Sequence, residues 1–174
     1  MVKGIKTACI DSCVVISLLK AGADRIDPKD IPILKGLLAD IHAGKIHIIF
    51  PSILRMELLE CNLGKHLIDE FELWTGLTNF DEVPVNSKVS KTASEIRSYY
   101  ADLHIKTNKK TPKLAGPDCV FIATAIENDC PLLYTYDGDR IAPSKPRQLL
   151  ALKSPIAGKY PLHIQKPDIL QFGM

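Results

Sequence analysis

The sequence predicts an α/β protein, built as a three-layer α/β/α sandwich around a central parallel sheet of about four to five strands. Short, nearly continuous apolar runs alternate with longer stretches whose apolar residues recur at helical spacing. Strands that are covered on both faces give such continuous runs, because right-handed crossovers lay helices over each face of a parallel sheet. A chain of 174 residues is enough for one core, so we expect a single domain over residues 1–174.

The N-terminal half is expected to alternate between strand and helix. The predicted ranges are 5–10 (strand), 14–19 (helix), 33–41 (helix), 46–50 (strand) and 53–74 (one long helix). Asp30 is expected to cap the second helix and Gly44 to close it, because these residue types favour helix ends. Pro51 and Ser52 mark the start of the long helix, since proline suits a first turn.

The C-terminal half continues the same alternation. The predicted ranges are 80–85 (strand), 87–103 (helix), 120–126 (helix), 132–136 (strand), 148–152 (short helix) and 162–165 (strand). Ser87 is expected to cap the helix that it begins. The stretch 105–116 holds four lysines, two threonines and a proline, and it predicts a polar loop.

Composition excludes several classes of protein. No stretch approaches the roughly 20 apolar residues of a membrane span, so we expect no membrane association. The number of cysteines is odd and four of the five lie in apolar runs, which indicates reduced thiols and a cytoplasmic location. The five cysteines form no C-x-x-C pair and the five histidines no H-x-x-x-H pair, so a zinc site of thiolates or imidazoles is not expected. A net charge of +2 does not by itself indicate nucleic-acid binding, which requires a local basic patch.

Acidic residues stand where the expected strands end and the expected helices begin. Asp11 and Asp137 each follow an apolar strand, whereas Glu57 and Asp118 lie in first turns of helices. The functional crevice of a parallel sheet lies beyond the carboxyl ends of its strands, so we expect these four carboxylates to converge there. Hard oxygen ligands of this kind suit Mg²⁺ or Mn²⁺.

Each carboxylate also has an ordinary structural interpretation. Asp11 and Asp118 could cap helices, and Asp137 could belong to a turn. Glu57 is more informative, because it shares a helix face with apolar residues, where a carboxylate needs a partner. Glu60 lies near that face too, so helical spacing leaves the choice between the two glutamates open.

Three segments resemble motifs of the PIN-domain family, particularly those of VapC-type toxin ribonucleases. They are Ala-Cys-Ile-Asp-Ser-Cys-Val-Val-Ile-Ser-Leu-Leu (8–19), Gly-Pro-Asp-Cys-Val-Phe-Ile-Ala-Thr-Ala (116–125) and Leu-Leu-Tyr-Thr-Tyr-Asp-Gly-Asp (132–139). The resemblance spans residues 5–142. One position departs from the pattern: the third position of the first motif is Cys13, where an asparagine is common in the family.

The resemblance implies a PIN-like fold in which Asp11, Glu57, Asp118 and Asp137 are the catalytic residues and metal ligands, with Asp139 as a further metal ligand. In such nucleases Mg²⁺ or Mn²⁺ polarises the scissile phosphate and lowers the pKa of a bound water. The implied function is that of a metal-dependent endoribonuclease acting on single-stranded or structured RNA, as the toxin of a toxin–antitoxin pair. The alternative is a non-catalytic PIN-like module that binds RNA or a protein partner.

Contacts to an RNA substrate are expected from polar residues that flank the crevice. The candidates are Ser12, Thr135, Lys109, Lys110, Lys113 and Arg140, with Arg55 as a further cation. The lysines before Asp118 are well placed for phosphates, although a solvated loop explains them equally well. The family resemblance also implies an antitoxin partner that fills the acidic groove, and assembly as a homodimer.

Other functions of α/β proteins fit the sequence less well. A phosphatase of the haloacid-dehalogenase type needs a second Asp two residues after the first, where this chain has Cys13. The chain contains neither the G-x-G-x-x-G of a dinucleotide-binding site nor the G-x-S-x-G of a serine hydrolase.

Overall fold

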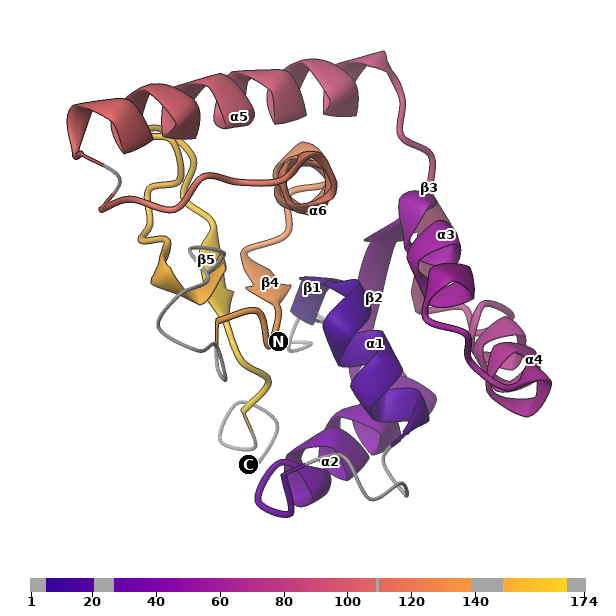
Figure 1. Cartoon of the computed structure of the whole chain (residues 1–174). Coiled ribbons are helices and arrows are strands. Elements are labelled where there is room, and N and C mark those ends of the chain that lie inside the picture. Colours follow the sequence, from indigo (N-terminus) through magenta and orange to yellow (C-terminus); the bar gives the residue numbers. More distant parts are fainter. Residues whose placement is uncertain (1–5, 21–26, 109, 139–148, 169–174) are drawn as a thin grey trace, which may run out of the picture.

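A computed structural model describes residues 6–20, 27–108, 110–138 and 149–168. Its strands are β1 (Lys6–Ile10), β2 (Ile46–Pro51), β3 (Phe80–Val83), β4 (Leu132–Tyr134) and β5 (His163–Gln165). They form one five-stranded sheet in the order β3-β2-β1-β4-β5, and each pairing is parallel (Figure 1). The predicted parallel sheet is therefore confirmed.

Helices cover both faces of this sheet. They are α1 (Ser12–Leu19), α2 (Ile31–His42), α3 (Ile53–Glu60), α4 (Lys65–Trp74), α5 (Ser87–Lys106), α6 (Gly116–Glu127) and the short 3₁₀ turn η1 (Leu149–Ala151). On one face α6 packs on β1, β2 and β4, and α5 lies outside it; α1 and α2 lie on the other face, with α3 and α4 beside α1 (Figure 1). This is the predicted three-layer sandwich. None of the described helices is long and apolar enough to cross a membrane.

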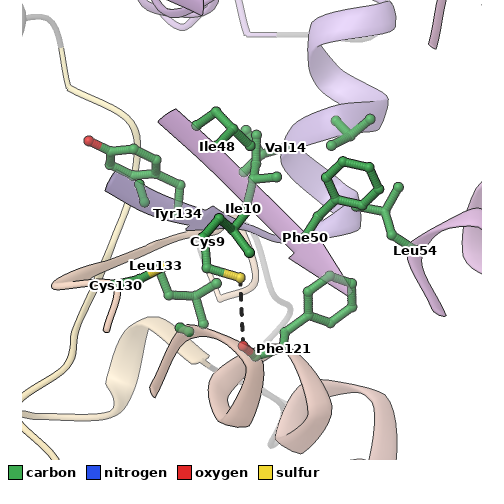
Figure 2. Close-up of a cluster of buried hydrophobic side chains, with 14 of the residues drawn as sticks. Cys9, Ile10, Val14, Ile48, Phe50, Leu54, Phe121, Cys130, Leu133 and Tyr134 are labelled. Atoms are coloured by element: carbon green, nitrogen blue, oxygen red, sulfur yellow. Dashed lines mark hydrogen bonds between the residues drawn. The ribbon is translucent and has the colours of Figure 1, made fainter. Parts of the chain in front are cut away.

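The central strands are apolar because both of their faces are buried. Ile10, Ile48 and Leu133 have no exposed surface. Figure 2 shows that Cys9 of β1 faces α6, where its thiol donates a hydrogen bond of 3.7 Å to the carbonyl oxygen of Phe121. This packing holds the carboxyl ends of β1 and β4 side by side, which determines where Asp11 and Asp137 lie.

The prediction of one long helix over 53–74 is wrong, since two helices occupy this range. α3 ends at Glu60, and α4 begins only at Lys65. Between them Asn62 has a left-handed φ of 51°, and Gly64 takes an extended conformation at the N-cap of α4. Asparagine enters the left-handed region more readily than most residues, so this short segment ends one helix and redirects the chain.

Helix and strand ends differ from the predictions at several positions. Asn86, not Ser87, caps α5, because its side chain accepts the backbone N–H groups of Lys88 and Val89 at 2.9 and 3.0 Å. β3 ends before Pro84, which has no N–H to donate to the ladder. Asp30 does occupy the N-cap position of α2, as predicted, without a capping hydrogen bond from its side chain.

Candidate active site

Asp11 lies at the carboxyl end of the central strand β1. Its backbone N–H donates to the carbonyl oxygen of Tyr134 at 3.0 Å, which carries the contact with β4 one residue further. Asp11 also takes the N-cap position of α1, but its side chain makes no capping hydrogen bond. Because Asp11 is only 8% exposed and its side chain turns towards Thr135, helix capping does not explain the placement of this carboxylate.

Two side chains donate to the same oxygen of Asp11. The hydroxyl of Thr135 lies 2.6 Å from Oδ2, and the thiol of Cys13 lies 3.1 Å from it. Each donor in turn accepts a backbone N–H, since Asp137 N lies 2.9 Å from Thr135 Oγ1 and Tyr136 N lies 3.1 Å from Cys13 Sγ. This network joins the end of β1 to the residues after β4 and fixes the orientation of the Asp11 carboxylate.

Glu57 of α3 lies beside acidic residues from two other elements. Burial raises the pKa of Glu57, and the charges of Asp11, Asp118 and Glu60 raise it further, whereas a hydrogen bond from Ser12 lowers it. The carboxylate that follows β1 and the one on α6 therefore act on the carboxylate of α3, although the three are distant in the sequence. Glu60 is exposed, so the geometry favours Glu57 as the glutamate of this group.

Asp118 lies in the first turn of α6, where it has a structural role as well. Its Oδ2 accepts the backbone N–H of Ala115 at 3.0 Å, which stabilises the start of the helix. The side chain is half-buried, and its charge raises the pKa of Glu57. Capping and membership in the acidic group are therefore compatible at this residue.

Asp137 connects the site to the C-terminal part of the chain. Its Oδ2 accepts the N–H of Leu149 at 3.0 Å, and its carbonyl oxygen accepts the N–H of Leu150 at 3.2 Å. One oxygen of this carboxylate is thus used to hold η1. The sequence offers no signal for this contact, because a backbone amide 12 positions away has no residue-type signature.

The predicted substrate contacts have different outcomes. Lys110 and Lys113 are exposed on the loop before α6, and Ser12 is half-buried between Asp11 and Glu57. Thr135 is fully buried, which suits a supporting hydroxyl and not a direct contact with RNA. The remaining candidates, Lys109, Asp139 and Arg140, lie outside the described residues.

Arg55 was a candidate for phosphate binding, and the structure gives it a different role. Its guanidinium pairs with Glu72 of α4 and, at 2.6 Å, with Glu82 of β3. It also lies 5.4 Å from the centre of the Phe71 ring. Through these contacts Arg55 holds α3 against α4 and β3, which is a structural role.

The acidic group fits a divalent cation in the chemistry of its donors. Its members supply hard oxygen ligands, and the repulsion that acts on Glu57 is of the kind that a bound cation relieves. Among the residues that the structure describes, no three His, Cys, Asp or Glu side chains are close enough together to form a ready metal site. Asp11, Glu57 and Asp118 are described carboxylates linked by these charge interactions, and their side chains would have to move closer together to bind one ion.

The class of protein is an α/β sandwich with acidic residues at the carboxyl ends of its central strands, and comparison with known proteins identifies the family. The model of the PIN domain matches residues 8–143, so the chain belongs to the PIN-domain family. This confirms the resemblance seen in the sequence motifs. A comparison with curated proteins finds no match.

Two solved structures are similar to this chain. VapC20 of Mycobacterium tuberculosis, a toxin that cleaves the sarcin–ricin loop, is 14% identical with a TM-score of 0.50, over 76% of this chain and 91% of that chain. VapBC2 of Rickettsia felis, bound to a DNA fragment from its promoter, is 15% identical with a TM-score of 0.46, over 74% of this chain and 86% of that chain.

Proposed function

We propose that this chain is a divalent-metal-dependent endoribonuclease, which hydrolyses phosphodiester bonds in single-stranded or structured RNA. The observation that carries the proposal is the environment of Glu57, whose pKa is raised by burial and by the charges of Asp11 and Asp118. Like charges held together beyond the carboxyl ends of parallel strands are suited to bind Mg²⁺ or Mn²⁺. Membership in the PIN-domain family supports the same function.

In this proposal Asp11, Glu57 and Asp118 hold the metal, with Asp137 and Asp139 as additional acidic residues. A divalent cation held at such a site would offset the negative charge of the phosphate and would lower the pKa of water, which makes hydroxide available as the nucleophile. The chain itself contributes position, because Thr135 and its neighbours orient Asp11 before any substrate arrives.

RNA would be held by cations on the rim of the site. Lys110 and Lys113 are exposed immediately before α6, the helix that begins next to Asp118, and phosphate contacts from such residues orient a substrate without reading its sequence. We extend this assignment to Lys109 and Arg140 from their places in the sequence. We also assign a contact with substrate to Ser12, a half-buried neutral side chain beside both Asp11 and Glu57.

We further propose that the protein is the toxin of a toxin–antitoxin pair in the cytoplasm and that it forms a homodimer. The similarity in fold to VapC20, which is described as a toxin, supports this choice. A short reading frame beside the gene, whose product copurifies with this chain and blocks its cleavage of RNA, is the expected result. A gene with no such neighbour would contradict the assignment as a toxin and leave the nuclease proposal in place.

The first test is cleavage of a labelled single-stranded RNA with Mg²⁺, with Mn²⁺ and with EDTA. Cleavage should require metal and should disappear in Asp11→Asn and Asp118→Asn. Asp129→Asn is the matched control, because Asp129 is exposed near the opposite end of α6 and its left-handed φ of 53° suits asparagine as well. All variants should keep the unfolding transition of the wild type.

Two results would contradict the proposal. Equal cleavage by the wild type and both site variants would place the activity elsewhere. No cleavage together with no Mn²⁺ binding would favour the non-catalytic module that binds RNA or a protein partner.

A further inference from the structure

The thiol of Cys13 lies between two motifs that are distant in the sequence. Its sulfur is 3.1 Å from Asp11 Oδ2, 3.1 Å from the backbone nitrogen of Tyr136 and 3.4 Å from Thr135 Oγ1. Tyr136 lies 123 positions further along the chain. Asparagine is common at this position in the family, so the sulfur is a feature of this chain.

One pairing of donors and acceptors gives every polar group around Cys13 a partner. The backbone N–H groups of Tyr136 and Asp137 can only donate, and they donate to Cys13 Sγ and Thr135 Oγ1. An ionised Asp11 can only accept, so the thiol and the hydroxyl both give their single proton to its Oδ2. The contact between Cys13 and Thr135 is then a packing contact without a proton of its own.

Two parallel connections therefore lead from the residues after β4 to one oxygen of Asp11. The first runs from Tyr136 N–H through the thiol of Cys13 to Oδ2, and we call it the Cys13 bridge. The second runs from Asp137 N–H through the hydroxyl of Thr135. The hydrogen bonds from Cys13 and Thr135 hold Oδ2 on the side of β4. The other oxygen, Oδ1, lies on the side of Ser12, whose hydroxyl is 3.4 Å away.

We propose that Cys13 is a positioning residue of the site. Through the Cys13 bridge it sets the orientation of the Asp11 carboxylate and directs Oδ1 towards Ser12 and Glu57, where the cation would bind. This inference rests on the proposed function, because it concerns the oxygen that would face the metal. Groups that orient metal ligands in this way affect affinity without touching the ion.

The bridge requires a side chain that donates one hydrogen bond and accepts another. Serine meets this requirement with a shorter reach, whereas alanine leaves Tyr136 N–H without its acceptor and Asp11 without one of its donors. Cys13→Ser and Cys13→Ala therefore separate hydrogen bonding from the mere loss of sulfur. Cys130→Ala is the matched control for removing a thiol, because Cys130 is buried just before β4, at the end of that strand away from Asp137.

The test measures the Kd for Mn²⁺ by titration calorimetry and the free energy of unfolding in urea. Cys13→Ala should weaken Mn²⁺ binding about tenfold, and Cys13→Ser should restore it to within about twofold of the wild type. Cys130→Ala should bind Mn²⁺ as the wild type does, even if it is less stable. Equal Mn²⁺ affinity in wild type and Cys13→Ala would overturn the inference, as would equal losses in the alanine and serine variants.

A second readout needs no metal. The amide signal of Tyr136 in a nitrogen–proton NMR spectrum should move in Cys13→Ala and return most of the way in Cys13→Ser. A wild type that binds no Mn²⁺ would refute the proposed function, and the Tyr136 signal would then decide alone whether the Cys13 bridge exists. An unchanged signal in Cys13→Ala would refute the bridge in either case.

Discussion

Helix α3 carries two side chains of opposite charge, and both of them have acidic neighbours. Arg55 lies between Glu72 and Glu82, so its charge is compensated by α4 and β3. Glu57 lies two residues later, about 200° around the helix, beside Asp11 and Asp118. The ion pairs of Arg55 join α3 to α4 and β3, whereas the like charges around Glu57 lower the stability of the fold. Selection for function explains the second arrangement better than selection for stability does.

The largest expected effect is on the side of α3 that carries like charges. Glu57→Gln keeps the shape of the side chain and removes its charge, so RNA cleavage should fall about a hundredfold or more. The free energy of unfolding should stay equal or rise, because a buried and repelled carboxylate has been neutralised. Cleavage rates and urea unfolding measure the two effects. Full activity in a normally folded Glu57→Gln protein would remove Glu57 from the site.

The opposite result is expected on the compensated side. Arg55→Met removes two ion pairs and the contact with the Phe71 ring, which should lower the free energy of unfolding by about 1–2 kcal/mol. The affinity for Mn²⁺ should not change. Lys65→Met, which removes an exposed cation at the start of α4, should leave stability nearly unaltered. A loss of Mn²⁺ binding in Arg55→Met would show that the two sides of α3 are not independent.

The pH dependence should distinguish the two kinds of carboxylate. Glu57 has a raised pKa in the folded state, so its contribution to stability is present below the ordinary pKa of glutamate and is lost as the pH rises through the raised value. Glu95 behaves in the opposite way, because Lys159 lowers its pKa and its contribution is lost as the pH falls through the lowered value.

Measured slopes of unfolding free energy against pH test this difference directly. Glu57→Gln should remove a fall in stability above the ordinary pKa of glutamate, and Glu95→Gln should remove a loss of stability in acid. Mn²⁺ binding should weaken as the pH falls through the raised pKa of Glu57, since a protonated carboxyl is a poor ligand. Identical slopes in both variants would contradict the assignment of opposite shifts.

The smallest expected effect concerns the more exposed partner of Arg55. Glu72 is 48% exposed and Glu82 only 27%, so solvent screens the pair with Glu72 more strongly. Glu72→Gln should therefore cost about 0.5 kcal/mol of unfolding free energy, less than Glu82→Gln. A double-mutant cycle with Arg55→Met isolates each pair. A larger coupling for Glu72 would mean that exposure does not rank these contacts.

Several features of the fold and site could be predicted from residue pattern alone. Apolar runs gave the strands, and the position of Asp11 after the first run placed it at the carboxyl end of the sheet. Helical spacing brought Glu57 to a buried side of α3, but it could not separate Glu57 from Glu60 or show that Arg55 has two acidic partners. Those facts depend on which elements pack against α3, and a single helix does not contain that information.

Other features had no usable signal in the sequence. The cap of α5 shifted by one residue, from Ser87 to Asn86, because two neighbouring polar side chains compete for the same role. The thiol of Cys13 was noted only as a departure from the family pattern, since its partners Tyr136 and Thr135 belong to a distant motif. Contacts between motifs appear only when the chain is folded.

The backbone N–H groups of Leu149 and Leu150 both donate to Asp137, which holds residue 137 next to the start of η1. Because residues 149 and 150 are held at Asp137, the position of Asp137 depends little on how many residues lie between 137 and 149. Doubling the length of a chain segment whose ends are held together costs only about 0.6 kcal/mol of closure entropy. Insertions or deletions between residues 137 and 149 would therefore cost little free energy while the acidic residues stay in place.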